Sequence, residues 1–211
     1  MTTVIGIQGE GFAVLASDTR ITSFADDGPA YQMATLGSGV SKIATNGKYL
    51  IGTAGDLRAI NLLTHAFSPP PAPVGVKGKK LDQFITVKFI PALRACFDLH
   101  GYSPPENKEN KNHNAEQGSS ILVVVNATIY MIDNDYSWLS DASGYYAVGS
   151  GSDYALGAVH ALAGGKKISA IQAKGICLKA LSISAKLDPH TGSPYHTYIQ
   201  TMEPKASDRK K

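Results

Sequence analysis

The chain has 211 residues, of which 18% are charged, and a formal net charge of +3. This length fits one domain, or at most two small ones, and can bury a core without disulfides or metals. No basic stripe with interleaved aromatic residues supports nucleic-acid binding, no apolar run reaches the roughly 18 residues of a membrane span, and no signal peptide is evident, so we expect a soluble, cytoplasmic protein.

The first half of the chain opens with strands. Strand patterns occur, in chain order, at residues 3–7, 11–17, 42–45 and 48–53. The second of these is apolar on both faces, which predicts a buried central strand. Asn46-Gly47 is a hairpin signal between the last two. Residues 22–41 are rich in Gly, Asp, Pro and Ser, and we expect them to be irregular.

Two helices are expected next. Asp56 is the N-cap candidate of the first, which the proline-rich run Ser68–Pro73 should end. The second covers residues 81–100 and contains Pro91, which should kink it or break it in two. Residues 103–119 are polar, charged and proline-containing, which is typical of a surface loop.

The second half again places strands before paired helices. Strand patterns lie at residues 121–125, 128–133, 136–139, 145–148 and 195–201. Gly149-Ser150-Gly151-Ser152 should open a helix that ends at Ala163, and Ser169 should cap another over residues 170–186. Blocks of hairpin-linked strands and paired helices predict an α+β fold with layered sheets. We expect residues 2–203 to form a single domain and residues 204–211 a frayed basic tail.

Three residues near the start could act together in catalysis. Removal of Met1 would give Thr2 a free α-amine, with a pKa near 7.7–8.0, that can serve as the base for its own hydroxyl. Asp18 ends an apolar strand, so its charge needs a partner. Lys42 begins another strand, and a partly buried lysine favours the deprotonated form of a nearby amine or nucleophile. Taken singly, these residues are more often an ordinary chain start, a structural salt bridge and a solvated lysine.

Two glycine turns, at residues 51–56 and 148–152, each end a strand and open a helix. Backbone N–H groups in such turns can stabilise an oxyanion. Neither turn has the lysine of a Walker phosphate-binding loop, and neither lies in the alternating strand–helix–strand context of a Rossmann fold, so nucleotide binding is a poor interpretation. Cys96 and Cys177 lie in apolar runs without metal-type spacing, so we interpret them as buried thiols and not as a disulfide.

Taken together, these residues resemble the proteasome β-subunit family, and the HslV-type peptidases in particular. The run Thr2–Ile7 is similar to the mature N-terminus of that family, and Asp18 follows Thr2 by sixteen residues, the family spacing of the active-site acid. Gly52 in Ile-Gly-Thr-Ala-Gly-Asp matches the glycine whose N–H forms the oxyanion hole. The run Ala147–Ala155 is similar to the Gly-Ser-Gly segment and the helix after it.

The resemblance implies a four-layer αββα sandwich, in which two antiparallel sheets lie between helical layers, and a threonine-type endopeptidase with an N-terminal nucleophile. The implied catalytic residues are Thr2, Asp18, Lys42, Gly52, Ser150, Asp188 and Thr191, the last two matching a late Asp-x-x-Ser/Thr pair. The segment between Asp18 and Lys42 is several residues longer than the family usually has.

The resemblance also bears on cofactors and partners. It implies that no cofactor is required, and it makes the backbone carbonyls of Ala185, Asp188 and Thr191 candidate ligands for a structural monovalent cation. It implies polypeptide substrates, a homo-oligomeric ring and an ATP-dependent unfoldase as a partner. Two alternatives stay open, namely a non-proteolytic amidohydrolase with an N-terminal nucleophile and an inactive scaffold subunit of the same fold.

Overall fold

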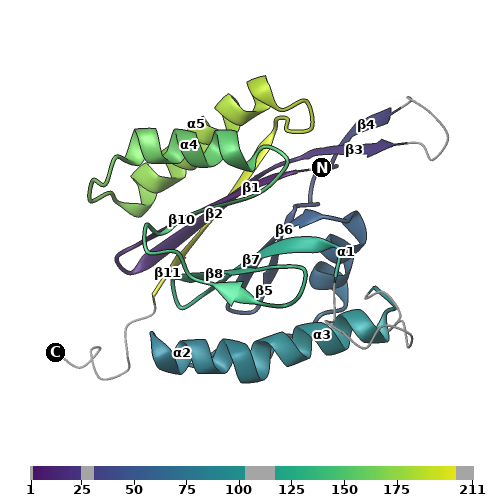
Figure 1. Cartoon of the computed structure of the whole chain (residues 1–211), viewed down its shortest axis with the longest axis vertical. Coiled ribbons are helices and arrows are strands. Elements are labelled where there is room, and N and C mark those ends of the chain that lie inside the picture. Colours follow the sequence, from purple (N-terminus) through teal and green to yellow (C-terminus); the bar gives the residue numbers. More distant parts are fainter. Residues whose placement is uncertain (1, 25–30, 103–116, 203–211) are drawn as a thin grey trace.

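Two antiparallel sheets form the centre of the molecule (Figure 1). The structure is a computed structural model, and it describes residues 2–24, 31–102 and 117–202. The first sheet has the order β10-β1-β2-β11, built from β1 (Thr3–Gly9), β2 (Phe12–Asp18), β10 (Tyr145–Gly149) and β11 (Tyr195–Thr201). The second has the order β5-β6-β7-β8-β9, built from β5 (Ile43–Asn46), β6 (Tyr49–Gly55), β7 (Ser119–Val125), β8 (Thr128–Ile132) and β9 (Trp138–Leu139).

Helices cover the outer face of each sheet (Figure 1). The first sheet packs against α4 (Ser152–Ala163) and α5 (Ala170–Leu187). The second packs against α1 (Leu57–His65) and a rod made of α2 (Lys79–Phe84), η1 (Ile85–Phe89) and α3 (Ile90–Leu99). Because side chains alternate along a strand, Val4 enters the apolar cluster between the sheets while Ile5 enters the cluster beneath α4 and α5. The predicted four-layer αββα sandwich is confirmed.

Local signals mark several element ends as predicted. The Asp56 carboxylate accepts the Arg58 N–H at 2.8 Å and caps α1. Ser169 caps α5 in a capping box with Gln172. Gly164 ends α4 in the left-handed conformation, with φ 54°.

Two segments differ from expectation. The stretch predicted to be irregular contains a two-stranded ribbon, β3 (Arg20–Phe24) and β4 (Tyr31–Thr35), which extends past the sheets beside the N-terminus (Figure 1). Its strands are short, and the turn-forming composition around them hides their pattern. The helical run is not broken in two at Pro91, because α2, η1 and α3 follow one another without a gap. Instead η1 forms a π-helical turn just before it, in which the Ile90 N–H donates to the Ile85 carbonyl, and this wider turn accommodates a residue that lacks an N–H.

Some expectations fall outside the described residues, namely Met1, most of the predicted 103–119 loop and the 204–211 tail. Within the described ranges, no helix combines the length and the hydrophobicity that crossing a membrane requires.

Candidate active site

Strand ends meet beside the N-terminus and bring three predicted residues to one place. Thr2 directly precedes β1, Asp18 ends β2, and Lys42 directly precedes β5. Lys42 Nζ lies 2.7 Å from Asp18 Oδ1, and neither side chain has exposed surface. Thr2 is only 2% exposed. The Thr3 N–H donates to Asp18 Oδ1 at 3.0 Å, so this ion pair adjoins the backbone of the first residues.

The Asp18 carboxylate accepts four hydrogen bonds from described residues. Oδ1 accepts from Lys42 Nζ and the Thr3 N–H, and Oδ2 accepts from the backbone N–H groups of Arg20 (3.0 Å) and Gly192 (3.1 Å). A buried carboxylate costs several kcal/mol unless it is compensated in this way. These bonds therefore fix Asp18, and through it the Lys42 ammonium.

Two opposing effects act on Lys42. Burial lowers its pKa, and the charge and hydrogen bond of Asp18 oppose that shift without cancelling it. Lys42 also donates to the Arg20 carbonyl. The result is an oriented ammonium close to the chain start, where a positive charge favours the neutral form of a neighbouring amine.

A second cluster forms around Asp188, immediately after α5. The hydroxyls of Ser150 (2.8 Å) and Thr191 (2.6 Å) donate to Oδ2, and the His190 N–H donates to Oδ1 at 3.1 Å. The Ser150 hydroxyl also lies 3.5 Å from the Thr2 carbonyl oxygen. Desolvation acts to raise the pKa of Asp188, but the three hydrogen bonds outweigh it and hold the pKa below the usual 3.8. The structure thus brings Ser150, Asp188 and Thr191 together beside Thr2.

The oxyanion role predicted for Gly52 stays a prediction, and the strand ladder around Gly52 does not favour it. It lies inside β6 between β5 and β7, paired with Ile43 and Leu122. The Thr53 N–H donates to the Lys42 carbonyl at 3.0 Å, so Thr53 faces β5 and the alternation of an antiparallel ladder turns the Gly52 N–H toward β7. A Cβ on Gly52 would lie 2.7 Å from the Val4 side chain, so the glycine makes room for packing between the sheets.

Gly55, three residues later at the end of β6, is a second candidate for the same role. The same alternation turns its N–H toward the edge where Lys42 lies. It is exposed and has φ 135°, a conformation that favours glycine. Its neighbour Ala54 lies 3.2 Å from the Cβ position of Gly149, which in turn abuts the Thr2 carbonyl. Both glycines stand in the same short run, and the choice of Gly52 rested on the resemblance alone.

Sequence reasoning also missed the contacts of Arg20 with the loop after α5, which we call the Arg20 clasp. Arg20 Nη1 donates to the Pro189 carbonyl at 2.8 Å. The guanidinium lies so close over Gly192 that a Cβ there would overlap it. The clasp holds the loop that carries Asp188 and Thr191 against the end of β2. Gly192 is required because the Arg20 side chain lies over it, and residue spacing along the sequence cannot reveal such a contact.

The cation prediction on Ala185, Asp188 and Thr191 stays a prediction. The Asp188 carbonyl already accepts the Thr191 N–H at 3.2 Å. The candidate ligands are neutral carbonyl oxygens, and one of them is thus already engaged in a hydrogen bond. Among the described residues, no group of three or more His, Cys, Asp or Glu side chains is placed to hold a metal ion.

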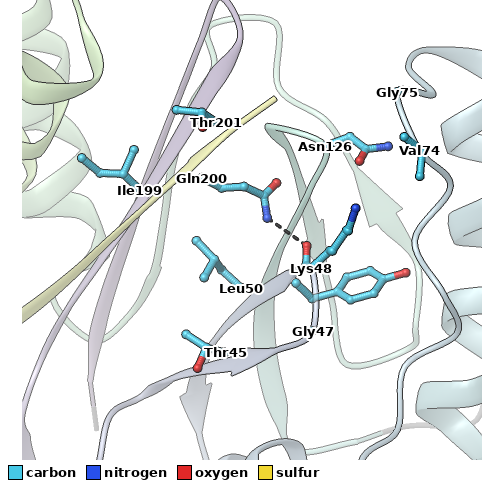
Figure 2. A pocket seen from close by; sticks show the side chains of 11 residues that line it. Thr45, Gly47, Lys48, Leu50, Val74, Gly75, Asn126, Ile199, Gln200 and Thr201 are labelled. Carbon is cyan, nitrogen blue, oxygen red and sulfur yellow. Dashed lines mark hydrogen bonds between the residues drawn. The ribbon is translucent and has the colours of Figure 1, made fainter. Parts of the chain in front are cut away.

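A hollow of about 360 Å³ lies near the opposite ends of β5, β6 and β11 (Figure 2). Its lining includes Lys48, Asn126 and Gln200, and none of the predicted catalytic residues. The Gln200 amide donates to the Lys48 carbonyl at 2.9 Å and accepts the Ala127 N–H at 2.8 Å, so it joins two turns. We interpret this hollow as the space left where these turns meet, and not as a catalytic site.

Comparison with known proteins supports the architecture. No family model matches the sequence, and no curated protein matches it. Among solved structures, BPH from Thiobacillus denitrificans aligns with a TM-score of 0.69 and 19% identity over 96% of this chain and 100% of that one. BPH in complex with epoxomicin aligns with a TM-score of 0.66 and 18% identity over the same shares of the two chains. Eukaryotic HslV from Trypanosoma brucei aligns with a TM-score of 0.59 and 18% identity over 94% of this chain and 99% of that one. At these identities the likeness establishes architecture alone, and the chain has the fold of the proteasome β-subunits and HslV.

Proposed function

We propose that the chain is a threonine-type endopeptidase in which Thr2 becomes the N-terminal nucleophile once Met1 is removed. The observation that carries the proposal is the Lys42–Asp18 ion pair, fully buried beside the first residues of the chain. A buried ion pair is weak support for stability, because apolar residues of similar volume often serve as well. An oriented ammonium next to a free α-amine has a clear use in catalysis.

The proposed reaction uses the chain's own groups. Thr2 Oγ attacks the scissile carbonyl, and the Thr2 α-amine accepts the hydroxyl proton, directly or through a water molecule. The Lys42 charge keeps that amine neutral before attack. The protonated amine then gives its proton to the leaving amine as the peptide bond breaks, which leaves an ester on Thr2. Water hydrolyses the ester and restores the hydroxyl.

We assign the oxyanion to the N–H of Gly55. Support comes from the direction of that N–H, toward the edge beside Lys42, and from the contact of its neighbour Ala54 with Gly149 at the Thr2 carbonyl. Losing one oxyanion donor typically raises a barrier by about 2.7–4 kcal/mol. The Ser150 hydroxyl, which donates to Asp188, lies 3.5 Å from the Thr2 carbonyl oxygen, so a second hydrogen-bonded cluster adjoins the nucleophile.

The assembly belongs to the same proposal. We infer a closed ring of copies that admits polypeptides, an ATP-dependent unfoldase as partner, and a cytoplasmic location. The low share of charged residues supports buried ring contacts, as do apolar side chains exposed on this protomer, such as Ile171 (72%) on α5 and Leu99 (81%) on α3. Size-exclusion chromatography should show a mass far above that of one chain, and a clean monomer would contradict the ring.

The test compares the unchanged chain with Thr2→Ala on a panel of fluorogenic peptides and small amides. Thr2→Ser is the matched control, because it keeps a nucleophilic hydroxyl. We expect peptide cleavage by the unchanged chain, partial cleavage by Thr2→Ser and none by Thr2→Ala. Full activity in Thr2→Ala would refute the mechanism. Cleavage confined to small amides would favour the amidohydrolase alternative, and no turnover at all would favour a scaffold subunit.

A further inference from the structure

We propose that Thr3, the residue after the nucleophile, is a positioning residue whose hydroxyl orients Thr191 and, through it, Asp188. The inference rests on the proposed function and adds a residue that the sequence did not single out. Its basis is a chain of buried hydroxyls beneath the candidate active site.

The contacts are short and shielded from water. Thr3 Oγ1 lies 2.5 Å from Thr191 Oγ1, which lies 2.6 Å from Asp188 Oδ2. Ser184 Oγ of α5 lies 3.4 Å from Thr3 Oγ1. Thr3, Thr191 and Ser184 have no exposed surface. Water therefore does not compete for these hydrogen bonds, and each depends on its protein partner.

Each hydroxyl has one proton to donate, and this fixes the direction of every hydrogen bond in the network. An ionised carboxylate only accepts, so Thr191 must spend its one hydroxyl proton on Asp188. The Ser184 hydroxyl donates to the Gly151 carbonyl at 3.0 Å. The short contact between the two threonines is then satisfied only if Thr3 is the donor. Thr3 therefore donates a hydrogen bond to Thr191, and Thr191 donates one to Asp188. Ser150 also donates a hydrogen bond to Asp188.

Gly151 limits the freedom of this network. A Cβ on Gly151 would overlap the hydroxyls of Thr3 and Ser184 and would lie 2.8 Å from that of Thr191. The three hydroxyls therefore pack against a bare Cα, with little room for another rotamer. Because Gly151 follows Ser150, the same contacts hold the backbone that bears Ser150.

Thr3 also joins the two halves of the site. Its backbone N–H donates to Asp18, the partner of Lys42. Its hydroxyl donates to Thr191, which in turn donates to Asp188. Both bonds originate one residue after Thr2. Losing the hydroxyl should leave the Lys42 half in place and loosen the Asp188 half, so turnover should suffer more than substrate binding.

The test compares Thr3→Ser with Thr3→Ala, which differ from each other only by the hydroxyl. Ser182→Ala is the matched control, because Ser182 lies on α5 two residues before Ser184 and its hydroxyl donates to its own helix at Lys179. Loss of Met1 is checked by mass spectrometry in every variant, and folding by the thermal midpoint. We expect Thr3→Ser and Ser182→Ala to keep kcat within about threefold and Thr3→Ala to lose about tenfold in kcat at an unchanged KM, the scale of one buried hydrogen bond.

Equal kcat values for Thr3→Ser and Thr3→Ala would overturn the inference while leaving the proposed function intact. Failure of the unchanged chain to cleave peptides or to react with epoxomicin would instead refute the proposed function. Crystal structures of the two variants test the hydroxyl network independently of activity. We expect the Thr191 side chain to keep its rotamer in Thr3→Ser and to turn in Thr3→Ala, and an unmoved Thr191 in both variants would contradict the network.

Discussion

Replacing Asp18 by Asn should destabilise the protein more than replacing Lys42 by Met, although both changes break the same ion pair. The reason is that Asp18 also holds local backbone. Its carboxylate accepts three backbone N–H groups besides the Lys42 ammonium, whereas Lys42 Nζ donates to Asp18 and to the Arg20 carbonyl. Asp18 therefore carries more of the local structure than its partner does.

The size of the difference follows from these contacts. In Asp18→Asn, whichever way the amide turns, its NH2 group faces two donors, so two hydrogen bonds are lost and the buried ammonium loses its counter-charge. We expect a loss of about 3–5 kcal/mol in the free energy of unfolding. In Lys42→Met, three N–H groups still compensate the carboxylate, and we expect a loss of about 1–3 kcal/mol.

The assay is urea unfolding at pH 7, followed by the fluorescence of Trp138, the single tryptophan of the chain. Lys167→Met is the matched control, because Lys167 pairs with Glu10 at the same 2.7 Å but the two side chains are 86% and 82% exposed. That variant should not shift the midpoint measurably. A Lys42→Met loss equal to or larger than the Asp18→Asn loss would show that the backbone hydrogen bonds of Asp18 do not set the difference.

Three further predictions concern the loop after α5, acid stability and the thiols. Gly192→Ala should cost about 1–3 kcal/mol of stability because its Cβ displaces the guanidinium of Arg20; in an Arg20→Ala background the cost should nearly vanish, and an equal cost in both backgrounds would exclude the clasp. The depressed pKa of Asp188 means that its contribution to stability is complete above about pH 5 and is lost as pH falls through 3.8 toward the lower folded value. Asp188→Asn should therefore flatten the loss of stability between about pH 5 and pH 3, measured by thermal unfolding, whereas an unchanged pH slope would contradict this origin. Burial raises the pKa of Cys177 to about 12 and raises that of Cys96 by less, so iodoacetamide should modify Cys96 first at pH 8 and leave peptidase activity intact; faster modification of Cys177, or inactivation by labelling, would contradict this.

The sequence was most informative where local chemistry decides the structure. Asp56, Ser169 and Gly164 end helices through hydrogen bonds and backbone angles that involve only near neighbours. The apolar run of β2 indicated a central strand, and β2 does lie between β1 and β11. Periodicity and capping thus predicted most of the layered fold.

Long-range contacts escaped the same reasoning. The ladder that turns the Gly52 N–H into β7 depends on a strand that lies seventy residues away in the chain. The bond from Gly192 to Asp18 and the hydroxyl bond from Thr3 to Thr191 span even longer stretches. Spacing along one sequence cannot reveal which of two nearby glycines faces the nucleophile, nor which hydroxyls meet beneath it.

The proposed mechanism depends on Thr2, freed of Met1, as the nucleophile. The most direct measurement is peptide mapping by mass spectrometry after incubation with epoxomicin, the compound present in one of the similar structures. Thr2→Ala and a form that retains Met1 serve as controls. We expect one covalent adduct on Thr2 of the Met1-free chain and none in either control. A Met1-free chain that takes up no adduct, or carries it on another residue, would contradict the proposed role of Thr2.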